Sequence, residues 1–222
     1  MKYVIVDFEM NPIAEAYRTA GQASRMEIIE IGAVIMDESL TVIGEFKTLV
    51  KPQFNHEIFK RYETLTGITT EMVAKAPEFA AAYEMFADWC ASYGDEVEIY
   101  AWSDTDHYQL VSEMKMKNYN NREKKKLLDH WYDFQKEYTK KLGLERIISL
   151  EKALDYAGIN FKGRIHDALC DARNTAELFS IIRDEEKCEQ ALKSVMEALK
   201  PKNINGTLGE MFDFSIFLSQ EE

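Results

Sequence analysis

The chain of 222 residues has few cysteines and no long apolar run, and each absence excludes a class of protein. Cys90, Cys170 and Cys188 are an odd number at wide spacing without a C-x-x-C pair, which argues against a disulfide framework and a zinc site. No apolar stretch reaches the roughly 18 residues that a membrane span needs. The first apolar run meets Asp7 before a signal region could form. We therefore expect a soluble, cytoplasmic protein with no membrane partner.

Positive charge is also scarce, because 27 Lys and Arg stand against 39 Asp and Glu, for a formal net charge of −12. Proteins that bind nucleic acid usually cluster Lys and Arg to neutralise phosphates, so this balance argues against such a partner. That argument weakens if part of the acidity is a metal-binding cluster, because bound cations reverse the local field. Length and a hydrophobic content of 46% suit one domain with a helical extension.

Short apolar runs predict strands in the first fifty residues, and helical periodicity dominates the rest. Strands are expected at 3–8, 26–36 and 41–50, the last two joined as a hairpin, and a buried strand at 97–102. The polar stretch 11–25 is expected to be a loop. This order predicts an α/β fold around one mixed sheet. Helices are expected after Thr69 or Thr70, from Pro77 to Gly94, and at about 105–117, 121–142, 149–157 and 168–199.

Asp7-Phe8-Glu9 places two carboxylates two residues apart at the end of an apolar strand. Both side chains therefore point to one face of the sheet while Phe8 points to the core. This geometry suits a shared metal ion. Taken alone, the pair is equally well explained as two solvated carboxylates.

A second pair of acidic residues, Asp104 and Asp106, follows the strand 97–102 directly. Functional groups gather at the carboxyl ends of such strands in α/β sheets. Asp is also a common helix N-cap, so we expect one of the two to be the cap. If the helix begins near residue 105, Asp104 stands at the capping position and Asp106 in the first turn can face Asp7.

The third acidic motif runs from His166 to Thr175. Residues five apart on a helix point about 140° apart, so His166 and Asp171 cannot share one helical face. We therefore place His166 on the loop before the helix, Asp167 at the N-cap and Asp171 one turn in, facing the sheet. For His166 by itself, a structural or solvent-exposed histidine is the commoner explanation.

Together these motifs resemble the DEDDh branch of the RNase T and DnaQ-like exonuclease superfamily, and in detail its Eri-type and KapD-like members. The resemblance covers roughly residues 3–182, with every motif in the family's order. It is carried by Asp7-Phe8-Glu9, Glu27-Ile28-Ile29-Glu30-Ile31-Gly32-Ala33-Val34, Leu65-Thr66-Gly67-Ile68-Thr69, Trp102-Ser103-Asp104-Thr105-Asp106 and the segment 166–175.

The resemblance implies a metal-dependent 3′→5′ exonuclease that acts on single-stranded RNA or DNA with a free 3′ end. By position, Asp7 would touch both of two divalent cations, Glu9, Asp106 and Asp171 would complete their ligands, and His166 would be the general base. Packed carboxylates repel one another unless cations neutralise them, and hard oxygen ligands favour Mg²⁺ or Mn²⁺. Two such cations can stabilise the attacking and leaving oxygens, and His166 can take a proton near neutral pH.

The resemblance also implies a ribonuclease-H-like fold, a mixed five-stranded sheet flanked by helices with a C-terminal helical extension. We assign residues 1–200 to the exonuclease domain and 201–222 to a C-terminal tail. The tail carries an aromatic-rich patch at 211–218 that is too apolar for simple disorder. It could fold back on the domain or form a homodimer contact.

Four residues are expected to contact the terminal nucleotides: Phe8, Met10, Leu65 and Ile68. In the family, the segment that contains the last two packs against the final bases. The alternative for Leu65 and Ile68 is a turn with core anchors. Met10 stands near a position where the family often has Thr, so the shape of the nucleotide pocket is open.

The segment 115–126 is rich in Lys and is the best sequence candidate for attracting a strand, although such a run is more often a solvated helix face. The aromatic residues Trp102, Tyr108 and Trp131 could stack bases, but their spacing is more typical of core residues.

Three other functions remain open from sequence. A phosphodiesterase acting on very short oligonucleotides would fit the negative charge. A non-catalytic module that binds nucleic acid or protein would fit the fold, although none of the five catalytic positions is lost. A structural acidic protein could use the patch 211–218 as its interaction element.

Overall fold

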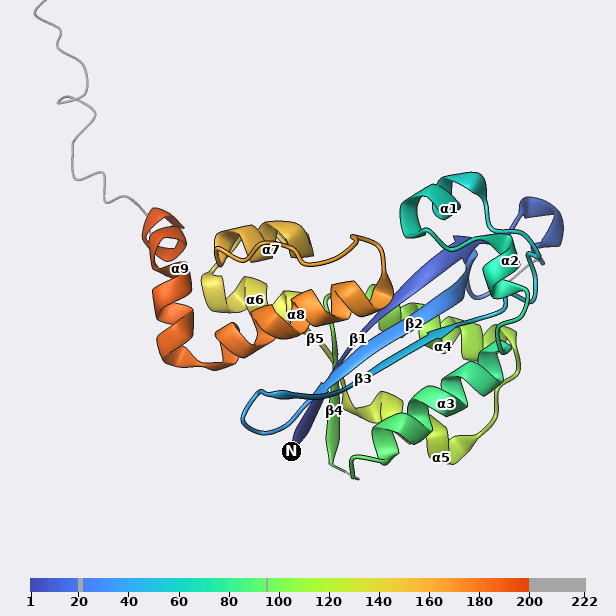
Figure 1. The fold of residues 1–222 in the computed structure, drawn as a ribbon, viewed down its shortest axis with the longest axis horizontal. Coiled ribbons are helices and arrows are strands. Elements are labelled where there is room, and N and C mark those ends of the chain that lie inside the picture. Colours follow the sequence, from blue (N-terminus) through green and yellow to red (C-terminus); the bar gives the residue numbers. More distant parts are fainter. Residues whose placement is uncertain (20–21, 95, 200–222) are drawn as a thin grey trace, which may run out of the picture.

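A computed structural model describes residues 1–19, 22–94 and 96–199, so the predicted tail, its patch at 211–218 and the roles considered for it lie outside the described residues. The described part contains a five-stranded sheet in the order β3-β2-β1-β4-β5 (Figure 1). β1 pairs antiparallel with β2 and parallel with β4, which confirms the predicted mixed sheet. The strands are β1 Lys2–Pro12, β2 Met26–Met36, β3 Val42–Leu49, β4 Val97–Ala101 and β5 Trp131–Asp133.

Helices cover both faces of the sheet, with α3 and α4 on one face and α6, α7 and α8 on the other (Figure 1). No helix in the described ranges is long and apolar enough to cross a membrane. The α-helices are α1 Lys60–Thr66, α2 Thr70–Val73, α3 Phe79–Ala91, α4 Thr105–Met116, α5 Arg122–Lys125, α6 Phe134–Leu142, α7 Leu150–Tyr156, α8 Ala168–Arg183 and α9 Glu185–Leu199. Two 3₁₀ helices, Glu15–Tyr17 and Lys126–His130, complete the described elements.

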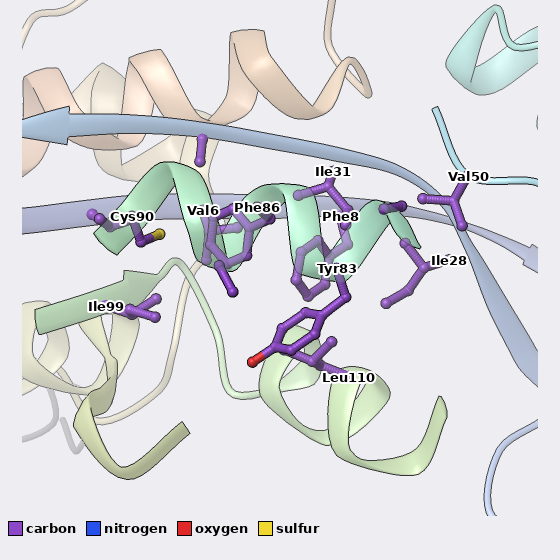
Figure 2. Close-up of a cluster of buried hydrophobic side chains, with 14 of the residues drawn as sticks. Val6, Phe8, Ile28, Ile31, Val50, Tyr83, Phe86, Cys90, Ile99 and Leu110 are labelled. Carbon is purple, nitrogen blue, oxygen red and sulfur yellow. The ribbon is translucent and has the colours of Figure 1, made fainter. Parts of the chain in front are cut away.

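Alternation along β1 divides the core into two layers. Val6 and Phe8 point towards α3 and α4, where Phe8 lies near Tyr83 and Leu110 (Figure 2). Ile5 points to the opposite face and packs in the cluster formed with α6 and α8. Because side chains alternate every residue in a strand, Asp7 and Glu9 fall on the α8 face.

Three predicted boundaries are wrong. The helix expected at 121–142 is interrupted by β5, because the backbone of Trp131 pairs with Ile99 of the buried strand β4. The helix expected at 168–199 breaks at Asp184, which has extended backbone angles and separates α8 from α9. The loop expected at 11–25 begins late, because β1 continues to Pro12, opposite Met26.

Candidate active site

The first two carboxylates lie where β1 extends beyond its partner β4. Pairing with β4 covers only Lys2–Ile5 of β1, so the strand past that point is open on that side. Asp7 lies opposite Gly32 of β2, and Glu9 lies opposite Glu30. A register shift follows directly after Glu9. Such irregularities bend a strand and re-aim its side chains, here beside the acidic pair.

The N-terminus of α8 approaches the sheet closely because β2 has a glycine there. A Cβ added to Gly32 would lie 2.2 Å from the backbone carbonyl carbon of Ala168. No side chain fits in that space, so any other residue would push α8 away from the sheet. The close approach brings Asp171, in the first turn of α8, over the strand that carries Asp7.

The segment before α8 adopts the arrangement that the sequence predicted. Asp167 is the N-cap, and its Oδ1 accepts a hydrogen bond of 3.1 Å from the Cys170 N–H. His166 precedes the helix with a φ of +62°, in the left-handed region that is uncommon for residues other than glycine. Its backbone N–H donates to Asp171 Oδ2 at 3.0 Å. The backbone turn therefore ties the histidine to the carboxylate.

Asp106 joins the same group from α4. It is only 7% exposed, and its Oδ1 accepts a hydrogen bond of 3.1 Å from the Phe8 N–H, between the two carboxylates of β1. Asp104 stands at the N-cap position of α4 as predicted, but its carboxylate makes no capping hydrogen bond and pairs instead with Lys136. The predicted cap interaction is therefore wrong, because a neighbouring lysine from α6 competes for the carboxylate.

A cavity of about 440 Å³ collects these side chains. All five predicted catalytic residues line it, together with Met10 and Leu65. Ile68 does not line it, because its side chain is 3% exposed and packs against Ile29 and Ile58. Ile68 is therefore a core anchor, and its predicted contact with the terminal nucleotides is wrong. Phe8 borders the cavity, but its ring is 5% exposed and lies in the core. The lining residues are Asp7, Phe8, Glu9, Met10, Met26, Tyr62, Leu65, Trp102, Ser103, Thr105, Asp106, Gln135, Ser149, Leu150, Glu151, Ile165, His166 and Asp171.

Burial and mutual repulsion make these carboxyl groups hard to ionise. Burial is the largest cause of the raised pKa of Asp7, followed by the charges of Asp106 and Asp171. Burial likewise raises the pKa of Asp106 and of Asp171 to about 7, and that of Glu9 to about 8. Among the described lining residues there is no Lys or Arg. No lysine or arginine of the described lining therefore neutralises the cluster.

The donor set fits hard divalent cations. One ligand atom each from Glu9, His166 and Asp171 lies within 4.8 Å of the others. Asp7 and Asp106 add oxygens from the same cavity wall. Buried carboxylates without a protein cation are the ligands that Mg²⁺, Mn²⁺ and Ca²⁺ select.

Sequence reasoning assigned no role to Glu30 and Lys47, which support the site from behind. Glu30 is buried and accepts a hydrogen bond of 3.0 Å from the Ala168 N–H at the start of α8. Lys47 Nζ lies 3.2 Å from Glu30 and 2.6 Å from the capping residue Asp167. This three-way contact holds the N-terminus of α8 against β2 and β3. The Glu27–Val34 motif contains Glu30, but only the long-range contact in the structure identifies Lys47 as its partner.

Arg164 also escaped sequence reasoning. Its Nη2 donates to the backbone oxygens of Thr64 at 2.9 Å and Leu65 at 3.3 Å, at the C-terminal end of α1. The guanidinium occupies the space beside Gly67, where an added Cβ would lie 2.1 Å from Nη1. Arg164 thus links the loop that carries His166 to the helix that carries Leu65.

The lysine-rich segment 115–126 is not one continuous solvated face. The side chain of Lys117 is only 5% exposed, and its Nζ pairs with Glu27 at 3.0 Å and Glu113 at 2.6 Å. Lys124 pairs with Asp88 and Lys126 with Glu123, which leaves fewer free cations than the sequence suggested. The Glu27 carboxylate also accepts hydrogen bonds from the backbone N–H groups of Gln53, Phe54 and Asn55.

The fold and the site together define the ribonuclease-H-like α/β class, with acidic side chains from β1, α4 and α8 converging at one end of a mixed sheet. The family model described as Exonuclease (RNase_T) matches residues 4–179. The chain therefore belongs to this exonuclease family.

Individual relatives agree with the family. The chain is 32% identical over 195 residues to ERI1 exoribonuclease 2 of Danio rerio, covering 79% of this chain and 34% of that protein. It is 30% identical over 204 residues to ERI1 exoribonuclease 2 of Homo sapiens, covering 82% and 28%. The chain thus spans about a third of the length of these relatives.

A solved structure shows the same fold. The nuclease domain of 3′hExo, a DEDDh family member determined bound to rAMP, superposes with a TM-score of 0.72 at 21% identity, covering 83% of this chain and 92% of that one.

Proposed function

We propose that this protein is a divalent-metal-dependent 3′→5′ exonuclease that hydrolyses single-stranded nucleic acid from its 3′ end. One observation carries the proposal: the four predicted carboxylates, from β1, α4 and α8, and the histidine of the loop before α8 line one cavity that has no Lys or Arg among its described lining residues. Membership of the exonuclease family supports it.

The residues divide the chemistry as follows. Asp7, Glu9, Asp106 and Asp171 would hold two Mg²⁺ or Mn²⁺ ions, with Asp7 in contact with both. When bound, these ions would supply Lewis-acid activation and neutralise the developing phosphate charge. His166 accepts the proton of the water that attacks phosphorus. The bond between phosphorus and the 3′ oxygen breaks, and that oxygen takes up a proton from solvent. This releases a nucleoside 5′-monophosphate and leaves a shortened strand with a free 3′ hydroxyl.

The apolar wall receives the terminal nucleotide in this proposal. Leu65 and Ile165 are both 41% exposed and line the cavity on the two segments that Arg164 links. Met10 adds an apolar contact from β1. The two relatives described above are named exoribonucleases, which favours RNA over DNA as the substrate. A phosphodiesterase acting on very short oligonucleotides is the second candidate, because the described cavity lining offers no cation to a longer strand.

The direct test is a time course with purified protein, Mg²⁺ or Mn²⁺, and 5′-labelled RNA and DNA oligomers. We expect a ladder of progressively shorter labelled products, and no reaction in EDTA. Internal cuts as the first products, or undiminished hydrolysis in EDTA, would contradict the proposal. Dinucleotides hydrolysed much faster than any longer strand would favour the second candidate.

Two alanine variants test which aspartate of α4 binds metal. Asp106 touches the β1 backbone inside the cavity, whereas Asp104 faces Lys136 outside it. We expect Asp106→Ala to fold but lose hydrolysis, because a ligand is removed. Asp104→Ala should retain hydrolysis at a stability cost of at most about 1 kcal/mol, since its ion pair is partly exposed and the capping bond is absent. Hydrolysis rates and urea unfolding of both variants check this, and an inactive, well-folded Asp104→Ala would reverse the assignment.

A further inference from the structure

The outer face of α4 forms an exposed stripe that begins at the cavity. Thr105 lines the cavity, and Tyr108, Val111 and Lys115 follow it at spacings of three or four residues. Residues at this spacing lie on one side of a helix. Tyr108 is 65% exposed and Val111 42% exposed, although the spacing of Tyr108 was more typical of a core residue. The buried face of α4 is the opposite one, formed by Asp106, Gln109, Leu110, Glu113 and Met114.

The stripe ends in a second hollow, of about 410 Å³. Lys115 and Lys125 line it together with Asn118 and Asn120, and its described lining includes no Asp or Glu. Lys125 also lies over the ring of Tyr119, 5.8 Å from its centroid, which orients the ammonium group.

The two lysines of the hollow differ from their neighbours in the same segment. Lys117, Lys124 and Lys126 are each paired with a carboxylate. Within the described ranges, neither Lys115 nor Lys125 makes an ion pair. In a chain with a net charge of −12, this hollow thus combines two ammonium groups and two amides with no carboxylate in its described lining.

Resting on the exonuclease function proposed above, we infer that the α4 stripe and its hollow carry the upstream part of a single-stranded nucleic acid whose 3′ end is in the cavity. Tyr108 offers a base an exposed ring to stack on, and stacking accepts every base because each has a π face. Lys115 and Lys125 then meet backbone phosphates, and the two asparagines can donate hydrogen bonds to phosphate or sugar oxygens.

The dimensions fit a short track. Ten residues of α-helix separate Thr105 from Lys115, which is about 15 Å at about 1.5 Å per residue. Phosphates of one stacked strand are spaced about 3.4 Å apart along the axis, so the track spans about four nucleotides, and fewer in an extended strand. The track therefore supplies positively charged groups that can hold a strand, whereas the described cavity lining has no Lys or Arg. It predicts that strands longer than about four nucleotides bind better than dinucleotides.

Length-dependent kinetics test the track. Values of kcat/KM would be measured in Mg²⁺ for a dinucleotide and an octanucleotide with wild-type protein, Lys115→Glu and Tyr108→Ala. Lys126→Glu is the matched control, because it changes the same charge on an exposed residue that faces Glu123 outside the hollow. We expect Lys115→Glu and Tyr108→Ala to lower kcat/KM on the octanucleotide about 5-fold or more, and on the dinucleotide less than 2-fold.

The salt dependence separates a phosphate contact from a general loss of activity. The slope of log kcat/KM for the octanucleotide against log salt concentration should become shallower by about 0.7 in Lys115→Glu, as one phosphate contact is lost from a single strand, and stay unchanged in Lys126→Glu. Equal losses on both substrates, or equal behaviour of Lys115→Glu and Lys126→Glu on the octanucleotide, would overturn the track while the exonuclease function stands. A wild-type protein that shortens neither substrate would overturn both.

Discussion

Asp7→Asn is expected to lower the rate of 3′ shortening by roughly 10³–10⁴-fold or more at saturating Mg²⁺. Burial, followed by the charges of Asp106 on α4 and Asp171 on α8, raises the pKa of Asp7. In our proposal Asp7 is the one carboxylate that would help to hold both cations. Asparagine keeps the shape of the side chain but removes the charge. The loss corresponds to the several kcal/mol of transition-state stabilisation that bound metal ions typically supply. Initial rates with a 5′-labelled oligomer measure it.

The same variant should be more stable than the wild type in EDTA, which distinguishes a lost ligand from a damaged fold. The folded-state pKa values of Asp106, Asp171 and Glu9 are raised to between about 7 and about 8, above their unfolded values near 4. Between about pH 4 and pH 8 the folded state therefore binds more protons than the unfolded state, so stability falls as pH rises. Asp7→Asn removes one buried charge and should lessen that fall.

Thermal unfolding in EDTA at pH 5, 7 and 9 measures this difference, and the same series in Mg²⁺ is the control. Added cation should stabilise the wild type most at high pH, where the carboxylates are ionised, and Asp7→Asn much less. A variant that is inactive and also less stable than the wild type in EDTA would mean that Asp7 is a structural residue.

His166→Ala is expected to lower turnover by roughly 10²–10⁴-fold, the usual loss for a general base. Metal binding should persist, because four carboxylates remain. The alternative is that His166 binds metal, because its ring nitrogen and a carboxylate oxygen each from Glu9 and Asp171 all lie within 4.8 Å of one another. Titration calorimetry with Mn²⁺ decides between them, with Asp171→Ala as the reference for a lost ligand. Equal loss of affinity in the two variants would make His166 a ligand.

A second substitution, His166→Asn, controls for the backbone. His166 has a φ of +62°, a conformation that asparagine adopts more readily than alanine does. Both variants should show the same loss of turnover if the imidazole is the base. Recovery of activity in His166→Asn alone would show that the backbone turn, with its N–H bonded to Asp171, is what the site requires.

The placement of the side chains on β1 and at the start of α8 was predictable because it follows from local patterns. Period-two alternation placed Asp7 and Glu9 on one face and Phe8 in the core. Residues five apart cannot share one face of a helix, so His166 was predicted to precede α8 if Asp171 faces the sheet. Asp167 was then the natural N-cap, as observed. Such rules involve residues within one turn or one strand, and tertiary contacts did not override them.

Other predictions failed where a distant partner competed with the local rule. The Asp104 carboxylate makes no capping hydrogen bond, because it forms an ion pair with Lys136 of α6. Trp131 lies in a strand and not in the predicted helix, because its backbone pairs with Ile99 of β4. Ile68 packs in the core, and Lys117 forms ion pairs with the buried carboxylates of Glu27 and Glu113. No spacing in the sequence reports these partners.

By itself, the sequence determined the alternating faces of β1, the N-cap of α8 and the identity of the acidic motifs, because those features depend on neighbours a few residues away. Only the tertiary structure decided that the motifs meet in one cavity and that Gly32 lets α8 approach the sheet. It also decided that Lys115 and Lys125 make no ion pair with any described residue, while the lysines beside them are paired. The physical reason is range: hydrogen bonds, ion pairs and burial act over a few ångströms in space, whatever the distance along the chain.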